Sequence, residues 1–178
     1  MGELADRLNS IHISVSTAGG NIVGTIYGRT ERQLWIAPDA YRRYNEPELE
    51  QHLENLLRRL TVAWMRQYHT IRSEVFGRTV TGAPPSENPR DQEFYRRRDE
   101  LLASGRSSNG RIIVELQGLR DWRVLIADHT LRLLTPEEFS QQFCEAALAA
   151  EQNQRRQIRE LKYRIYDPKG SRFDSSFS

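Results

Sequence analysis

Two groups of arginines are the residues of this chain best suited to chemistry with a charged ligand. They are Arg58, Arg59, Arg66 and Arg72, and then Arg155, Arg156, Arg159, Lys162 and Arg164. An arginine side chain presents a planar fork of donors that grips phosphate or carboxylate at two points. Neutralising phosphates in this way is the main sequence-independent contribution to DNA affinity. We therefore predict these nine residues as candidate phosphate contacts, with the second group stronger because only Glu160 offsets its cations.

The alternative interpretation of both groups is an ordinary solvated helix face. Glu54 precedes Arg58 by four residues, and Glu160 precedes Arg164 by the same spacing. Such i,i+4 pairs stabilise a helix surface without any ligand. The triplet Arg96, Arg97 and Arg98 adds a third basic group. A formal net charge of +2 is only mildly basic, so composition does not decide between the two interpretations.

No other residues form a recognisable catalytic or metal-binding pattern. The four histidines are scattered, Cys144 is the only cysteine, and there is no P-loop or G-x-G-x-x-G sequence. We therefore expect a protein that is not an enzyme, with no metal and no cofactor. Trp35, Trp64 and Trp122 could stack on bases. Their positions in predicted strands or on an apolar helix stripe favour core or interface roles instead.

Two long helices are predicted to carry the basic groups. Thr135-Pro136-Glu137-Glu138 is a capping box, with a hydroxyl at the N-cap and Glu three residues later, and Asn45-Glu46-Pro47-Glu48 has the same spacing. Apolar residues then recur every three or four positions toward Phe76-Gly77 and toward Asp167-Pro168. At about 30 residues each, the helices would be about 45 Å long. They would outrun a small sheet, so we expect their distal halves to pack on each other or on a partner.

Each helix follows a predicted β-meander, and the whole pattern repeats after 90 residues. Residues 11–15, 22–27 and 33–37 read as strands of the first copy, and 111–117 and 122–127 as strands of the second. Gly20 and Gly28 meet Gly110 and Gly118 under the same shift, without a gap. The apolar positions of the helices stay in phase as well. This register indicates an internal duplication.

The expected organisation is a first unit over 1–76, a linker over 77–93, a second unit over 94–167 and a disordered tail over 168–178. The linker assignment depends on the Pro- and Gly-containing stretch 82–89, and residues 94–103 read as a short helix opening the second unit. No apolar run is long enough to span a membrane, and Met1-Gly2-Glu3-Leu4 does not begin a signal peptide. We therefore expect a cytoplasmic protein without a membrane partner.

The first copy resembles the YbaB/EbfC family of nucleoid-associated proteins. The resemblance lies in the Gly-rich segment 18–28, in the strand ending Leu34-Trp35-Ile36-Ala37-Pro38, and in Glu48-Leu49 at the start of a long helix. It covers residues 11–76 well and 110–166 more loosely. Residues 2–10 allow only a couple of turns where the family opens with a long helix. The resemblance implies an α+β fold of two tandem YbaB-like units, arranged as a pseudo-two-fold dimer within one chain.

Members of that family form tweezer-shaped homodimers and bind DNA, so the resemblance implies a largely sequence-independent binder of duplex DNA located at the nucleoid. A second reading stays open: a protein-interaction scaffold or accessory subunit, for example of an actinobacterial secretion system, near which YbaB-like proteins occur. That partner would dock along the long helices. The Leu-rich stripe over residues 49–60 is also an expected contact for a second copy of the chain.

Overall fold

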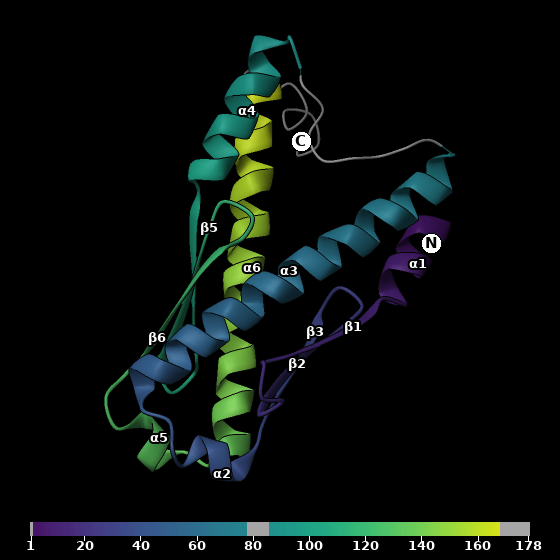
Figure 1. Cartoon of the computed structure of the whole chain (residues 1–178). Helices are drawn as coiled ribbons and strands as arrows, with labels where there is room; N and C mark the ends of the chain where they lie inside the picture. Colours follow the sequence, from purple (N-terminus) through teal and green to yellow (C-terminus); the bar gives the residue numbers. More distant parts are fainter. Residues whose placement is uncertain (1, 78–85, 168–178) are drawn as a thin grey trace, which may run out of the picture.

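The computed structural model describes residues 2–77 and 86–167, so the predicted tail and residues 78–85 of the predicted linker lie outside the described residues. The linker prediction was wrong for residues 89–93, which form the start of a helix. The first half contains α1 (Glu3–Asn9), β1 (His12–Ser16), β2 (Ile22–Tyr27), β3 (Glu31–Ile36), α2 (Pro38–Tyr41) and α3 (Glu46–Phe76). The second half contains α4 (Pro89–Glu100), β4 (Leu102–Arg106), β5 (Ile112–Gln117), β6 (Asp121–Ile126), α5 (Thr130–Leu133) and α6 (Pro136–Tyr166). The chain is an α+β protein (Figure 1).

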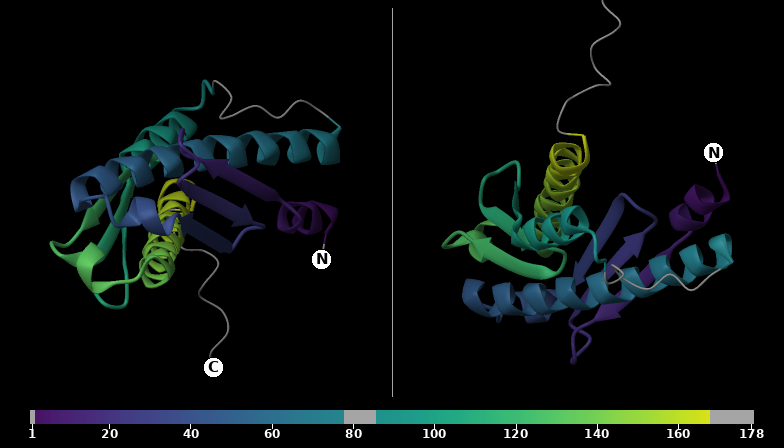
Figure 2. Two further views of the ribbon diagram at one scale, coloured as in Figure 1. Left: turned by 60° about the horizontal axis from the view of Figure 1, so that its bottom comes forward. Right: turned by 90° about the horizontal axis from the view of Figure 1, so that it is seen from above.

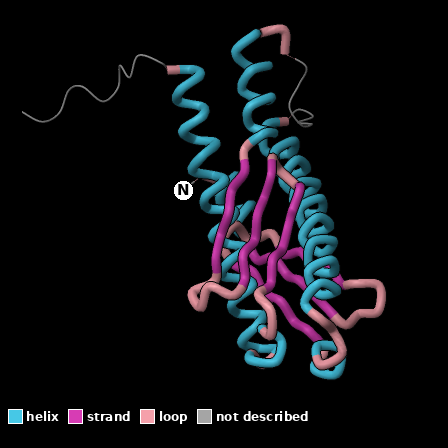
Figure 3. Tube along the Cα trace, turned by 90° about the vertical axis from the view of Figure 1, so that its left-hand side faces the viewer, coloured by secondary structure: helices cyan, strands magenta, loops and turns pink. Residues whose placement is uncertain are grey.

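The strands form two separate antiparallel sheets of three strands, in the orders β1-β2-β3 and β4-β5-β6 (Figure 3). Every strand of the second sheet, and the helix α6, begins and ends 90 residues after its counterpart. The pairing shifts equally, since His12 pairs with Tyr27 and Leu102 with Gln117. The two halves therefore share element order, strand bounds and sheet register.

Glycines with positive φ make the turns of both sheets possible. Gly28 has φ 56° and Gly118 has φ 58°, a left-handed conformation that favours glycine. A Cβ at Gly28 would lie 2.8 Å from Asn9 O, and one at Gly118 would lie 2.9 Å from Asp99 O. The glycine is thus required at this turn by its conformation and by the close backbone in front of it.

The predicted strands are confirmed within two residues, with one omission. The strand expected over 22–27 has those bounds, and the others shift by one or two residues at their ends. The prediction missed β4 and extended the opening helix of the second half over 94–103. The helix is instead Pro89–Glu100, and Leu102 already belongs to β4. The sequence LASGR has little β-propensity of its own, so pairing with β5 and packing on α6 decide its conformation.

Both predicted capping boxes are present. The side chain of Asn45 accepts from Glu48 N at 2.9 Å, and Glu48 accepts from Asn45 N at 3.2 Å. Thr135 and Glu138 make the same reciprocal pair. The helix α3 ends at Gly77 with φ 61°, and α6 ends before Asp167, as predicted.

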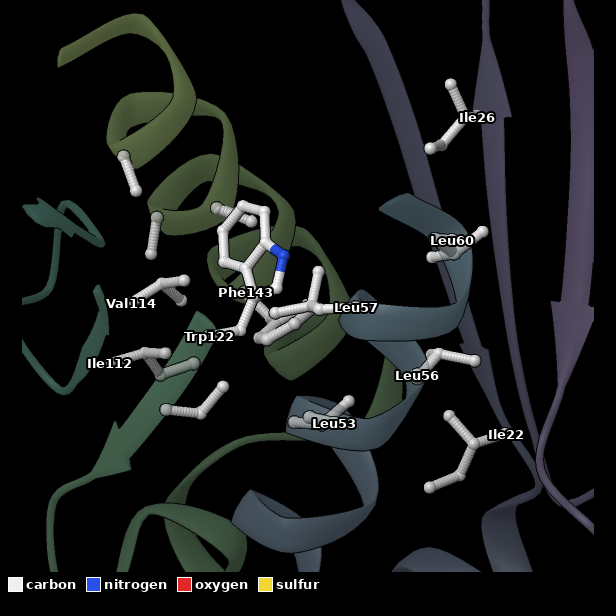
Figure 4. Packing of buried hydrophobic residues seen from close by; sticks show 14 of the residues in the cluster. Ile22, Ile26, Leu53, Leu56, Leu57, Leu60, Ile112, Val114, Trp122 and Phe143 are labelled. Atoms are coloured by element: carbon white, nitrogen blue, oxygen red, sulfur yellow. The ribbon is translucent and has the colours of Figure 1, made fainter. Parts of the chain in front are cut away.

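One hydrophobic core joins the two halves, because each long helix also contacts the other half's sheet. The helix α3 lies against β6 and α6 lies against β3. In Figure 4, Leu56 and Leu60 of α3 point toward the first sheet. On the opposite side of α3, Leu53 and Leu57 lie beside Trp122. All these leucines are buried, so the Leu-rich stripe expected to recruit a second chain is occupied by the chain's own core.

The distal halves of the long helices diverge from this core (Figure 1). Of the two arrangements expected for them, packing on each other is therefore wrong, and packing on a partner stays a prediction. Each distal half is covered by the opening helix of the same half of the chain: α4 lies beside α6, and α1 lies beside the end of α3 (Figure 2). Tyr166 Oη donates to Asp91 Oδ1 at 2.5 Å, and the rings of Phe94 and Tyr166 are 5.8 Å apart. Arg7 pairs with Glu74 at the other tip.

Candidate nucleic-acid interface

The distal half of α6 presents most of the second basic group to solvent. Arg155, Arg159 and Lys162 follow one another at spacings of four and three residues, which places them on one side of the helix. Arg159 and Lys162 are exposed and have no hydrogen bond or ion pair with the described residues. Arg156 is exposed and donates only to the Asn153 side chain, at 3.2 Å. These cations are available to a ligand.

A further cation, which the sequence did not single out, joins this group from the first half. Arg29 lies in the β2–β3 turn, and its carbonyl oxygen accepts from Arg155 Nη2 at 3.3 Å. Burial lowers the pKa of Arg155, and the charges of Arg32 and Arg29 lower it further, whereas Glu151 opposes the shift. We call the set Arg29, Arg155, Arg156, Arg159 and Lys162 the α6 cationic face. The tertiary fold alone brings Arg29 there, because 126 residues separate it from Arg155 in the chain.

Other predicted cations are occupied within the protein. Arg164 lies 4.0 Å from Glu160, as the solvated-face interpretation predicted. Arg96 and Arg97 pair with Glu93, and Arg98 pairs with Asp99. The third basic group is therefore neutralised on its own helix.

The first basic group is dispersed along α3 and does not form one surface with α6. Arg58 donates to Trp122 O at 3.4 Å, and Arg59 donates to Ser16 O at 2.6 Å, so both tie α3 to strands. Arg72 lies over the Tyr68 ring at 5.5 Å and over the Phe76 ring at 5.6 Å. Arg66 is exposed without a side-chain partner among the described residues. Their structural roles account for most of this group.

The three tryptophans have different environments. Trp122 is buried in the core and its Nε1 donates to Thr61 Oγ1 at 2.9 Å, in agreement with the core role expected for it. Trp64 is half-buried and stacks on Tyr68. Trp35 is 54% exposed, because its position in β3 directs the ring away from the core. No tryptophan lies in the α6 cationic face.

No group of metal ligands occurs among the residues that the structure describes. His69 is half-buried, and its Nδ1 has no hydrogen-bond partner among the described residues. Burial raises the pKa of the Cys144 thiol to about 11, the opposite of what a nucleophilic thiolate needs. The described side chains thus form a charged surface and no recognisable catalytic group.

Within residues 2–77 and 86–167, no helix is long and apolar enough to cross a membrane. Comparison of the chain with protein-family models, with characterised proteins and with solved structures finds no match.

Proposed function

We propose that this protein is a non-enzymatic, largely sequence-independent binder of duplex DNA, which contacts phosphates through the α6 cationic face. The observation that carries the proposal is that Arg156, Arg159 and Lys162 are exposed on a helix without an acidic partner among the described residues, next to Arg155, which lies 3.4 Å from Glu151. A helix fixes the backbone spacing of such cations, so only their side chains have to be ordered when they contact phosphates.

We also propose that the architecture is a tandem pair of YbaB-like units that form a pseudo-two-fold dimer within one chain. Two contacts between the halves support it. Thr61 of α3 accepts from Trp122 of β6, and Glu151 of α6 accepts from Arg32 of β3 at 2.8 and 3.2 Å. Each residue of the second contact lies 90 positions from its counterpart in the first. Exchanged contacts of this kind are what a two-fold interface produces.

A gel-shift titration of duplex DNA at several salt concentrations tests the DNA proposal. Each phosphate contact contributes about 0.9 to the slope of log affinity against log salt. Replacing Arg156, Arg159 and Lys162 with Gln should weaken binding equally across sequences and flatten that slope by about 2–3.

The matched control replaces Arg96, Arg97 and Arg98 with Gln, which removes the same charge from a neutralised helix. This control should bind nearly as the parent does. Equal losses in both variants would indicate attraction by net charge alone. If the parent protein shifts no DNA at micromolar concentration and low salt, the proposal is wrong.

A second candidate function, protein binding, is favoured by the distal part of α3. Trp64, Tyr68 and Ile71 continue its apolar stripe beyond the buried leucines, but they are only half-buried. Trp64 Nε1 is buried without a hydrogen-bond partner in the described part of the chain. Light scattering of the parent and of Tyr68→Asp would show whether this stripe takes up a second copy of the chain. A parent that stays monomeric at high concentration excludes that partner.

A further inference from the structure

The edge strand of the second sheet is capped by carboxylates from the other half of the chain. Glu50 Oε1 accepts from Ile126 N at 2.7 Å, and Glu54 Oε1 accepts from Val124 N at 3.1 Å. Outward-pointing N–H groups of an edge strand otherwise stay unpaired. The fit is geometric: four residues of helix advance about 6 Å, and two residues of strand about 6.6 Å. One turn of α3 therefore matches two alternate N–H groups of β6.

The equivalent edge of the first sheet lacks this cap. Leu34 and Ile36 of β3 pair with Gly24 and Ile22, in the same register that Val124 and Ile126 occupy in the second sheet. Their N–H groups therefore also point outward. The helix against this edge is α6, which carries Cys144 and Ser140 where α3 carries Glu54 and Glu50. No described carboxylate hydrogen bonds to either N–H group.

A cavity of about 380 Å³ lies in the same place. Residues 32–36 of β3 form one wall, and α6 contributes Pro136, Glu137, Ser140, Gln141 and Cys144. The Leu34 N–H is directed at the Cys144 sulfur, a weak acceptor, and burial keeps that thiol protonated by raising its pKa. The cavity thus lies where side chains of α6 are too short to do what the glutamates of α3 do.

We propose that this cavity binds a ligand with two carboxylates about 6–7 Å apart, recognised by the N–H groups of Leu34 and Ile36. The chain itself shows the recognition chemistry at the equivalent edge, where Glu50 and Glu54 supply both carboxylates. Trp35, 54% exposed at the rim, offers an apolar surface for the spacer between them. The volume is within the range of small-ligand sites, about 300–1,000 Å³.

Charges around the cavity set the strength of this binding. The guanidinium of Arg32 is already held by Glu151 and by the carbonyl of Glu31, so recognition depends on the backbone donors. Glu137 lines the cavity and repels a second anion. Glu137→Gln should therefore tighten binding of a dicarboxylate several-fold.

Two sources can present such a pair of carboxylates: a free dicarboxylic acid, or an extended peptide with acidic residues at alternate positions. The probes are glutarate, adipate and the acetylated, amidated peptide Glu-Ala-Glu, each at about 10 mM, with acetate and chloride as controls at equal ionic strength. Backbone amide shifts of Leu34 and Ile36 in ¹H–¹⁵N spectra report occupancy. Shifts with the free acids alone, with the peptide alone or with both support the site and name its source.

A designed variant provides the second readout. Ser140→Glu with Cys144→Glu places carboxylates where α3 has them, so the chain should cap its own edge. The variant should melt at a higher temperature than the parent and bind the effective probe at least about tenfold more weakly. Gln152→Glu, on an exposed part of α6, is the matched control and should change neither property. Parent spectra that no probe changes beyond acetate overturn the proposal, whatever the variant does.

Discussion

The two halves of the molecule fill equivalent positions with side chains of very different size. The helix α3 directs Leu56, Leu57 and Leu60 into the core, whereas α6 has Ala146, Ala147 and Ala150 at the positions 90 residues later. The strands compensate in each half. Gly24 faces Leu56 and Leu60, where a Cβ would meet their side chains at 2.8–3.3 Å. The small residues of α6 let β4 approach until a Cβ at Gly105 would lie 2.1 Å from Ala146 O.

The polar contacts between the halves differ in the same way. A neutral hydrogen bond joins Thr61 and Trp122, whereas an ion pair with little exposure joins Glu151 and Arg32. Both halves share the turn glycines, the capping boxes and the spacing of apolar residues along the long helices, so these features specify the fold. The contacting side chains can differ between the halves if the total side-chain volume of the contact is kept and every buried polar group keeps a hydrogen-bond partner.

The largest loss of stability is expected at core positions that both halves fill with a large apolar side chain. Leu53 and Phe143 are equivalent and both are buried in the shared core. Leu53→Ala and Phe143→Ala should each lower the free energy of unfolding by about 3–5 kcal/mol. Because the core is common, far-UV and near-UV circular dichroism should still report one denaturation transition.

Val62→Ala, at an exposed position of α3, is the control and should cost less than about 0.5 kcal/mol. Two separate transitions in either core variant would show that the halves are independent domains.

The next largest loss of stability is expected at the two polar contacts between the halves, Glu151–Arg32 and Thr61–Trp122. Glu151→Gln leaves the nearly buried charge of Arg32 without its anion and should cost about 3 kcal/mol. Thr61→Ala removes one neutral acceptor and should cost about 1–2 kcal/mol. Urea unfolding at pH 7 measures both.

Transplanting the first contact sharpens this test. Arg32→Trp with Glu151→Thr installs the Trp–Thr pair at the equivalent site and should recover part of the loss seen with Glu151→Gln. If the transplanted variant is less stable than Glu151→Gln alone, the two contacts are not geometrically equivalent.

A smaller difference is expected between the two strand glycines. At Gly105 a Cβ would also lie 2.3 Å from Ala150 N, so backbone blocks it on more than one side. Gly105→Ala should cost about 2–3 kcal/mol, whereas at Gly24 only leucine side-chain atoms must move, and Gly24→Ala should cost about 1 kcal/mol. Thermal unfolding of the two variants side by side measures the difference. Equal losses would contradict the closer approach of β4 to its helix.

Sequence reasoning reached the elements because they depend on local signals. The local signals are the capping boxes, the three- or four-residue spacing of apolar residues in the helices, and the turn glycines. Each acts within a few residues, so α3, α6 and most strands were predictable. The strand β4 was not, because Ala103, Ser104 and Gly105 become a strand only through pairing and contact with α6. One signal could have revealed β4: the 90-residue shift aligns residues 102–106 with the predicted strand of the first half.

The site was predictable only in part, for the same reason. Helix spacing placed Arg155, Arg159 and Lys162 on one side, but no local pattern links Arg29 to them. Arg58 and Arg59 looked like surface cations because a helix pattern does not reveal which strand backbone lies opposite. Of the two glutamates that cap β6, Glu54 was assigned to a helix surface pair with Arg58 and Glu50 was not singled out, since their acceptor role exists only in the tertiary fold.

The smallest predicted effect concerns Cys144, whose counterpart Glu54 hydrogen bonds to the strand backbone. Burial raises the pKa of this thiol from 9.0 to about 11, so folding favours its protonated form. Its contribution to stability is complete below pH 9 and is lost as pH rises toward 11. The stability difference between the parent and Cys144→Ser should therefore be constant from pH 7 to about 8.5 and then shift against the parent by about 1–2 kcal/mol. Urea titrations at several pH values measure this stability difference, and taking the difference between the two proteins cancels the contribution of other groups that titrate there.

Because Cys144 is the only cysteine, slow alkylation of the folded protein by iodoacetamide at pH 8 provides an independent check. A difference that stays level to pH 11 would mean that the thiol is solvated, and the cavity beside it more open than the structure shows.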